Sequence, residues 1–418
     1  MTTGKQGDAL QQAPARFLKQ FRSVLAVDRA GSTSAASAQL PLSQSAVARA
    51  IRELESGLGT VVFERSPQGM LLTAEGQLLA YRAGRAMAQL QQAEAEAAHL
   101  AERRGANAPA TPGRFAAACS YRHVNTYLVF CEARSESAAA RQLGVSQPAV
   151  SQTLRQLEHM LGTSLYQRSA RGLRLTESGE AVLRRAKLAM DEFRLAQEDL
   201  GAFRGKMRGR IVVGALPLSA GALVPRAVEQ VLALNHELHV TIVDGTYDAL
   251  MHQLQHAEVD IIVGALRLGG AGADVNQETL FTDTLSVVVR QGHPLLQRSP
   301  SGLHELVDES WLVPLSGTPA RAAFERAFAA EGVAAPHGPL EVNSAAVLQA
   351  LLLESDRLAL VSRRQVAREV SAGLLAVLPV KVKQTTRHIG ITTRSDADPG
   401  AGLRLFMEQI RVLARDQL

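Results

Sequence analysis

One segment of this chain occurs twice, and this repeat constrains the fold more than any other feature of the sequence. When each residue n is aligned with residue n+103 without a gap, 22 of the 45 positions from Ser32 to Gly76 are identical. Two unrelated helical segments do not share residues at such a frequency, so the sequence predicts an internal duplication. The length of 418 residues agrees with this, because it suggests about three domains.

Each copy contains the pattern of a helix-turn-helix. In the second copy, residues 137–143 predict a short Ala-rich helix and Gly144 predicts a tight turn. Residues 146–158 then predict a second helix with its apolar side chains on one face. The opposite face carries polar side chains of the types that bind base edges and phosphates. These are Gln147, Ser151, Gln152 and Arg155.

The second copy resembles the DNA-binding module of the LysR-type transcriptional regulators. The match continues into that family's wing and the start of its linker helix, through Leu165-Tyr166-Gln167-Arg168-Ser169, Gly172, Leu175-Thr176 and Gly179. The resemblance implies two winged helix-turn-helix modules that bind double-stranded DNA. The candidate DNA contacts are Ser146, Gln147, Pro148, Ser151, Gln152, Arg155, Arg168 and Arg171 in the second copy, and Gln44, Ser45, Arg49, Arg52 and Arg65 in the first.

The two copies are not equally good candidates for reading DNA. The first has Pro41 where the second has Gly144, and proline cannot adopt the left-handed conformation that glycine accepts in a turn. The first wing also lacks two arginines of the second. Both copies depart from the family in Thr33 and Glu136, which stand where an aromatic residue is usual. We therefore expect the second copy to read the sequence and the first to act as an auxiliary clamp or as a packing partner that widens the footprint.

The distribution of charge supports a polyanionic partner for the first half of the chain. Residues 1–210 hold 28 Lys and Arg against 18 Asp and Glu, a net charge of +10. Residues 211–418 hold 17 against 22, a net charge of −5. A basic half joined to an acidic half is typical of a protein that binds nucleic acid with one part only.

A long helix with an apolar seam is predicted after each copy. Its apolar residues alternate in spacings of four and three, which is typical of a helix that packs along another helix. Because so long a seam is rarely covered within one small domain, we expect dimerisation through the second helix and weaker pairing through the Ala-rich first. The seam residues are Leu79, Ala83, Ala86, Leu90, Ala93, Ala97 and Leu100, then Val182, Ala186, Ala189, Phe193, Ala196, Leu200 and Phe203.

The last half of the chain alternates short apolar strands with helices, which predicts an α/β domain with parallel sheets and helices on both faces. It resembles the effector-binding domain of LysR-type regulators, which shares its two-subdomain architecture with periplasmic solute-binding proteins. Matching segments include Gly214-Ala215-Leu216-Pro217 and Gly292-His293-Pro294-Leu295. The predicted domains are 15–75 for the first module, 76–104 for its linker helix, 105–117 for a flexible linker, 118–178 for the second module, 179–206 for its dimerisation helix, and 210–418 for the effector domain, with subdomains 211–282 plus 385–418 and 283–384.

Several residues at predicted strand ends and helix starts are candidates for binding an effector. In such sheets ligands collect beyond the carboxyl ends of strands, and free N–H groups at helix starts suit anionic or polyhydroxyl ligands. Each hydroxyl or amide is equally well explained as a helix cap. The resemblance to an effector domain favours a pocket for an organic acid, an aromatic carboxylate or a sugar. The candidates are Pro217, Ser219, Ala265, Ser316, Thr318, Asn343, Ser344 and Ser362.

Little in the sequence predicts catalysis, and we predict no metal and no cofactor. His252 and His256 lack the intervening Glu of a zinc-protease helix, and Cys119 and Cys131 fit neither a metal site nor a disulfide framework. The longest apolar runs are far shorter than a membrane span, which needs about 20 residues. Residues 1–16 lack the apolar core of a secretion signal, so we expect a cytoplasmic protein.

The sequence thus predicts a transcriptional regulator whose DNA binding is controlled by a small-molecule effector bound between two α/β subdomains. RNA polymerase and a second or further copies of the chain, as a homodimer or homotetramer, are the other expected partners. Two alternatives stay open at this point. One is a metabolite-binding or enzymatic α/β domain tethered to DNA-binding helices. The other is an architectural DNA-binding protein with little sequence preference.

Overall fold

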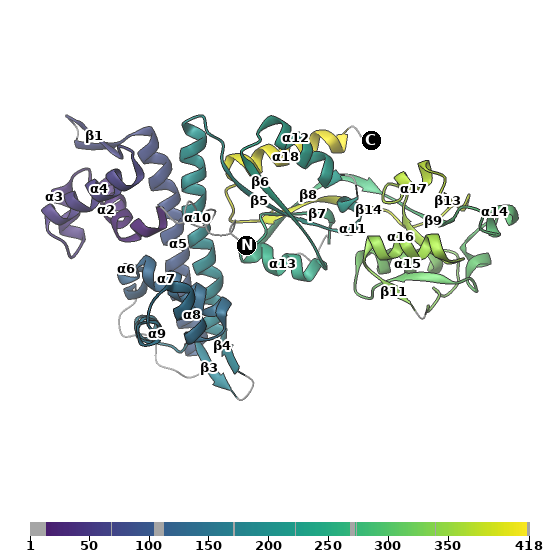
Figure 1. The fold of residues 1–418 in the computed structure, drawn as a ribbon, viewed down its shortest axis with the longest axis horizontal. Helices are drawn as coiled ribbons and strands as arrows, with labels where there is room; N and C mark the ends of the chain where they lie inside the picture. Colours follow the sequence, from purple (N-terminus) through teal and green to yellow (C-terminus); the bar gives the residue numbers. More distant parts are fainter. Residues whose placement is uncertain are drawn as a thin grey trace. The chain divides into compact units, whose positions relative to one another are not determined.

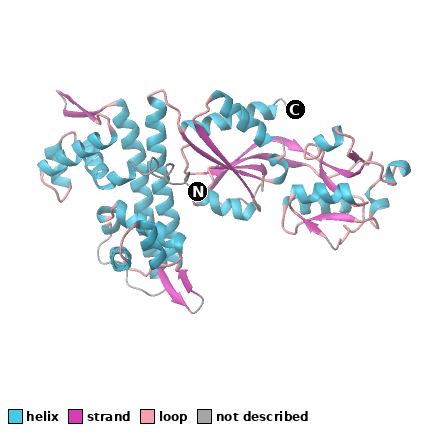
Figure 2. Cartoon of the chain, viewed as in Figure 1, coloured by secondary structure: helices cyan, strands magenta, loops and turns pink. Residues whose placement is uncertain are grey.

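The computed structural model describes residues 14–67, 69–103, 113–169, 172–221, 223–267, 272, 274–338 and 340–415. The chain forms two compact units, Met1–Arg208 and Gly209–Leu418. The first is helical with two small hairpins, and the second combines helices with two larger sheets (Figure 2). The predicted fold class, a mainly helical part followed by an α/β part, is confirmed. Within the described residues, none of the helices combines the length and apolarity needed to cross a bilayer.

The first unit contains one series of elements twice (Figure 1). The first module consists of η1 (Pro14–Phe17), α2 (Leu18–Ala30), α3 (Thr33–Gln39), α4 (Gln44–Leu58), β1 (Phe63–Ser66) and β2 (Gly69–Leu72). The second consists of α6 (Arg114–Ala118), α7 (Tyr121–Ala133), α8 (Glu136–Leu143), α9 (Gln147–Leu161), β3 (Tyr166–Ser169) and β4 (Gly172–Leu175). A long linker helix follows each module, α5 (Ala74–Glu102) and α10 (Glu177–Phe203).

Equivalent residues make equivalent bonds at the base of each wing. Glu55 accepts a hydrogen bond from the backbone N–H of Val62 at 2.8 Å, and Glu158 accepts one from Leu165 at 2.9 Å. The linker helix then passes directly over this backbone. A Cβ at Gly179 would lie 2.0 Å from the carbonyl oxygen of Leu165, so only glycine fits where the helix crosses the base of the wing.

The turns between the two helices of each helix-turn-helix differ. Gly144 adopts the predicted left-handed conformation, with φ +66°. In the first module, α3 ends in extended backbone at Leu40, with φ −111° and ψ 149°, and Pro41 follows. The starts of α3 and α8 are alike, because Ser32 and Ser135 each accept a hydrogen bond at 3.1 Å from the backbone N–H three residues on. Capping of the first helix of the motif is therefore shared. The second helix differs, because Ser43 accepts a hydrogen bond from the N–H of Ala46, whereas the side chain of Ser146 forms no cap bond.

The two linker helices pack against each other within one chain (Figure 1). All of the predicted seam positions except Leu100 and Phe203 are buried, and they join one apolar core with both modules. Each linker helix thus covers the seam of the other within one chain, and dimerisation through the second linker helix stays a prediction. Two seams of the same spacing are joined covalently here, so they pair without the entropic cost of bringing two chains together.

The second unit contains two five-stranded sheets. The first has the order β6-β5-β7-β14-β8, and the second has the order β11-β10-β12-β9-β13. Strands of the first sheet are β5 (Gly209–Ala215), β6 (Leu238–Asp244), β7 (Ile261–Ala265), β8 (Val275–Asp283) and β14 (Arg387–Arg394). Strands of the second are β9 (Leu285–Arg290), β10 (Trp311–Pro314), β11 (Glu341–Val342), β12 (Leu358–Ser362) and β13 (Leu375–Val377). The helices are α11 (Pro217–Ala220), α12 (Leu223–Leu234), α13 (Tyr247–Gln255), α14 (Leu295–Arg298), η2 (Leu303–Leu306), α15 (Pro319–Ala329), α16 (Ala345–Glu354), α17 (Ala367–Ser371) and α18 (Ala401–Arg415).

Both sheets are mixed, which corrects the expectation of parallel sheets. β5 pairs in parallel with β6 and β7, but β14 runs antiparallel to β7 and β8. In the second sheet, β9 runs antiparallel to β12 and β13. The chain enters the second sheet through β9 and returns to the first through β14. β9 and β14 run antiparallel to the strands beside them. The alternation of strands and helices along the sequence does not reveal this direction.

We expect Gly179→Ala to destabilise the first unit. Its new methyl group would overlap the backbone oxygen of Leu165, and overpacking of this kind costs about 1–3 kcal/mol. Gly84→Ala is the matched control, because a Cβ there has nothing within 4 Å. Removing a glycine from a helix interior is expected to stabilise by about 0.5–1 kcal/mol. Thermal unfolding followed by circular dichroism measures both, and equal melting temperatures for the two variants would contradict the close approach.

Candidate functional site

The second helix of each helix-turn-helix has one buried and one exposed face. On α9, the apolar face is buried through Val150, Leu154 and Leu157. The exposed residues include Ser146, which precedes the helix, together with Gln147, Pro148, Gln152 and Arg155. On α4 they include Gln44, Ser45, Arg49 and Arg52. With the exception of Ser151, the candidate contacts on these two helices are therefore on the outside of the modules.

Ser151 has a different environment from its predicted neighbours. Its hydroxyl donates a hydrogen bond to the carboxylate of Glu136 at the start of α8, and Glu136 is itself buried. The bond joins the two helices of the motif. Glu136 occupies the position where the family usually has an aromatic residue, so the departure in the sequence was the available signal for this polar link. The equivalent residues in the first module are Thr33 and Ala48, which cannot form it.

The wings differ in charge at two described positions, one of which is Glu64 on β1 against Gln167 on β3. Arg65 is exposed on β1, as predicted for a phosphate contact. Arg168 belongs to β3, but its side chain lies outside the described residues, and so does the whole of Arg171. Arg174 on β4 is exposed, while its counterpart Leu71 in the first wing is an exposed apolar residue. The second wing thus presents a guanidinium where the first presents an alkyl group.

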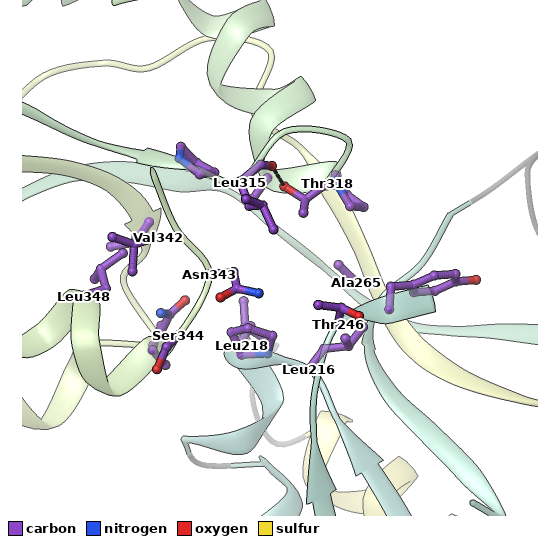
Figure 3. A pocket seen from close by; sticks show the side chains of 18 of the residues that line it. Leu216, Leu218, Thr246, Ala265, Leu315, Thr318, Val342, Asn343, Ser344 and Leu348 are labelled. Carbon is purple, nitrogen blue, oxygen red and sulfur yellow. Dashed lines mark hydrogen bonds between the residues drawn. The ribbon is translucent and has the colours of Figure 1, made fainter. Parts of the chain in front are cut away.

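The second unit contains a pocket of about 290 Å³ that is lined from both sheets (Figure 3). Six of the eight predicted effector residues line it: Pro217, Ala265, Ser316, Thr318, Asn343 and Ser344. Figure 3 shows the side chains of Asn343, Leu218 and Leu315 pointing into the same space. The structure therefore gathers residues that are more than 100 positions apart in the sequence.

Ser219 and Ser362 are not brought to this pocket. Both side chains are fully buried, and both hydroxyls are used within the fold. Ser219 donates to the carbonyl oxygens of Leu216 and Val263, and Ser362 donates to Asp283 at 2.7 Å. These bonds fasten strand ends, so the two serines are removed from the candidate set. A sequence shows a hydroxyl at a strand end but not the direction in which it points.

The starts of α15 and α16 combine capping with pocket lining. Thr318 accepts a hydrogen bond from the backbone N–H of Arg321 at 3.1 Å, and its hydroxyl donates to the carbonyl of Leu315 at 2.7 Å. Ser344 accepts one from the N–H of Val347 at 3.4 Å. The cap interpretation therefore holds for both hydroxyls. The pocket nevertheless lies against two helix N-termini, where partial positive charge favours an anion.

Two arginines that the sequence interpretation missed also line the pocket. Arg387 pairs with Asp283 at 2.6 Å, its side chain is only 10% exposed, and its Nε atom is buried without a hydrogen-bond partner among the described residues. The guanidinium of Arg267 stacks on the ring of Tyr247 at 4.0 Å and pairs with Asp248 at 2.8 Å. Neither arginine follows a recognisable motif, so only the fold reveals them.

Models of two protein families match this chain. The model described as bacterial regulatory helix-turn-helix protein, lysR family, matches residues 18–77 and again 121–180. The LysR substrate binding domain matches residues 204–414. The three matches together span most of the chain. The chain belongs to the LysR family of transcriptional regulators. It is thus a regulator with DNA-binding helix-turn-helix segments and a substrate-binding domain, and the pocket described above lies in that domain.

Relatives within the LysR family differ in how much of this chain they match. GalR of Pseudomonas putida is 34% identical over 406 residues, which are 96% of this chain and 98% of GalR. PcaQ of Agrobacterium fabrum is 35% identical over 294 residues, which are 70% of this chain and 94% of PcaQ. Two solved structures share the fold: OxyR from Pseudomonas aeruginosa, with a TM-score of 0.54 at 21% identity over 69% of this chain and 94% of OxyR, and CbnR, with 0.51 at 20% over 70% and 98%.

Neither cysteine of this LysR-family chain is expected to react readily as a thiolate. Burial raises the pKa of both Cys119 and Cys131 to about 12. Since an ordinary thiol has a pKa near 8.5, the native thiols at pH 8 should react with DTNB on the order of 1000-fold more slowly than the unfolded chain. The rate should rise as the pH approaches 12. Unfolding in guanidinium is the control and should release both thiols, while fast reaction of the native protein would contradict their burial.

Proposed function

We propose that the regulator binds an organic acid with an apolar body in the pocket of the substrate-binding domain, and that this binding controls its action on DNA. The observation that carries the proposal is the combination of an apolar wall with positive charge. Leu216, Leu218, Leu315, Leu348 and Val361 supply the wall. Two helix N-termini and two guanidinium groups face the same space, which suits a carboxylate better than a neutral sugar.

Arg387 is the residue that we expect to meet the carboxylate. Its charge is compensated by Asp283, and a buried Nε donor remains available. A buried donor without an acceptor costs about 1–3 kcal/mol, and a ligand oxygen would remove that cost. Arg267 on the face of Tyr247 adds a second cation at the wall formed by β7 and α13.

We expect the double variant Ser316→Ala with Asn343→Ala to weaken ligand binding without unfolding the domain. Both side chains line the pocket, and neither is the N-cap of α15 or α16. Losing two hydrogen bonds to a charged ligand should reduce the affinity by about 10- to 1000-fold. Calorimetric titration with benzoate-type, aliphatic dicarboxylate and monosaccharide probes measures this loss. Tightest binding of a monosaccharide by the wild type would contradict the proposed ligand class.

The matched control is Thr318→Ala with Ser344→Ala, which removes two caps. Each lost cap should cost about 1 kcal/mol of stability. Stability should therefore fall in the control pair and stay constant in the Ser316 and Asn343 pair. Unchanged ligand affinity in the latter pair would assign its side chains to the pocket wall only.

For DNA, we propose that the second module reads the base sequence and the first contributes mainly affinity. Support comes from the exposed Gln147, Gln152 and Arg155 on α9, and from exposed Arg174 against Leu71 in the wings. Arg168 and Arg171 remain proposed wing contacts. On α4 the exposed Arg49 and Arg52 suit phosphates as well as bases.

We expect Arg155→Ala to lose discrimination between cognate and mutated DNA sites, at a cost of about 1–3 kcal/mol for the cognate site. Arg52→Ala is the matched control at the equivalent position and should weaken all sites alike. Gel-shift titrations at fixed salt, with a fragment selected from a random pool by the wild-type chain, measure both. Equal loss of discrimination in the two variants would show that both modules read bases.

We further propose that the pocket binds its ligand without converting it, so that the protein is not an enzyme. The polar side chains around the cavity are amides, hydroxyls, two arginines and Asp248, whose carboxylate pairs with Arg267. The nearby Asp283 is occupied by Ser362 and Arg387. Mass spectrometry of a bound ligand after prolonged incubation would detect turnover. The cytoplasmic location, the homo-oligomer and the contact with RNA polymerase stay predictions.

A further inference from the structure

The interface between α5 and α10 is held by charges as well as by its apolar seam. The guanidinium of Arg82 is 1% exposed, and its Nε donates to Asp199 at 2.7 Å. Its Nη1 donates to Glu192 at 3.1 Å. Both acceptors are on α10, more than 100 residues further along the chain. A buried cation of this kind persists only where carboxylates meet it, so Arg82 fixes which part of α10 lies against α5.

The same contacts occur a second time with the helices exchanged. Arg185 on α10 is the equivalent of Arg82, and Glu96 and Gln89 on α5 are the equivalents of Asp199 and Glu192. Arg185 donates from Nε to Glu96 at 2.9 Å and from Nη1 to Gln89 at 2.8 Å. The arginine of each linker helix therefore forms hydrogen bonds with two residues at equivalent positions of the other linker helix. This reciprocity is the mark of an isologous interface, which normally joins two identical subunits.

The first short helix of each module also packs against the linker helix of the other module. η1 of the first module packs against α10, and α6 of the second module packs against α5. Phe21 of the first module also contacts Phe193 of α10, with ring centroids 5.4 Å apart. Each module is thus held by its own linker helix and by that of the other module.

The interface is reciprocal but not symmetric in charge, and the difference favours unlike helices. Glu192 receives both Arg82 and Arg85 of α5, the latter at 2.8 Å. The equivalent of Arg85 on α10 is Leu188, and the equivalent of Glu192 on α5 is Gln89. In a pair of two α10 helices with this register, two Glu192 carboxylates would approach each other and the second arginine would be missing. In a pair of two α5 helices, each Arg82 would keep a carboxylate at Glu96 but would meet Gln89 in place of Glu192. Like pairing is therefore disfavoured by buried charge.

We propose that each chain pairs its own two modules through the buried ion pairs between α5 and α10. We also propose that a single chain binds two adjacent DNA half-sites. Two-fold DNA sites are ordinarily read by two chains, because each supplies one recognition helix. Here α4 and α9 belong to one chain, and the two linker helices of that chain pack against each other. Since the second module is proposed to read bases and the first to add mainly affinity, only one of the two half-sites would depend strongly on base sequence.

The test reverses the charges of one contact in the full-length chain. Arg82→Glu and Asp199→Arg should each lower the melting temperature of the first unit, on the order of 10 °C. The double variant should recover part of the loss, because opposite charges again meet at position 199, while Glu192 still faces the reversed charge at position 82. The matched control is Arg82→Glu with Glu64→Arg, which makes the same change of formal charge at an exposed residue of β1, outside the interface, and it should not recover. If the melting temperature of the Arg82→Glu, Asp199→Arg variant does not exceed that of the control, the proposal that these charges determine the pairing of α5 with α10 is overturned.

Mixing distinguishes pairing within a chain from pairing between chains. If the helices pair within one chain, a mixture of the two single variants, unfolded and refolded together, stays as unstable as each alone. Recovery in the mixture would mean that α5 of one chain packs on α10 of another, and would overturn the proposal. If the buried contact tolerates no reversal, the more exposed reciprocal pair Arg185→Glu with Glu96→Arg provides a milder version of the same comparison.

The DNA part is tested by stoichiometry. Sedimentation of the wild-type chain with a fragment selected by it from a random pool should show a first complex of one chain per fragment. Footprinting of that complex should protect two adjacent segments, and Arg155→Ala and Arg52→Ala should each reduce protection of a different one. A first complex that contains two chains, or protection of one segment only, would overturn the single-chain unit while leaving the ligand proposal intact.

Discussion

The first unit depends on a guanidinium that is buried between two helices far apart in the sequence. Arg82 is 1% exposed, and its partners Glu192 and Asp199 are buried with it. Removing a cation from water costs several kcal/mol, and only these carboxylates and the surrounding seam offset that cost. The modules and wings are arranged around this pair of helices, since each module packs on its own linker helix and η1 and α6 pack on the other.

The second unit follows another constraint, which is that two mixed sheets place strand ends and helix starts around one cavity. β5, β7 and β10 end at the pocket, and α13, α15 and α16 begin there. Some polar groups, such as the hydroxyls of Ser219 and Ser362, form hydrogen bonds within the fold that stabilise this geometry. Other polar side chains face the cavity. The walls of this site belong to two sheets. A ligand that contacts both sheets would therefore stabilise one relative orientation of the two sheets over others.

Sequence reasoning was accurate where the determining contacts are local. The duplicated segments, the left-handed turn at Gly144 and the helix caps at Thr318 and Ser344 depend on residues within a few positions of one another. The pocket lining was found in large part because strand ends and helix starts are readable from pattern. The direction of Ser151 toward Glu136, and the arrival of Arg387 from a distant strand, depend on neighbours that no local pattern specifies.

By itself, then, the sequence determined that the chain holds two winged helix-turn-helix modules, two seamed helices and an α/β domain of the LysR type. Periodicity, caps and turns depend on residues close together in the sequence, so the structure that they predict is almost the structure that forms. Only the tertiary structure decided what covers each seam. An apolar stripe states that a helix needs a partner but not which one, because burial is non-directional. The choice of α5 for α10 rests on paired charges at matching register, and those charges meet only after the chain has folded.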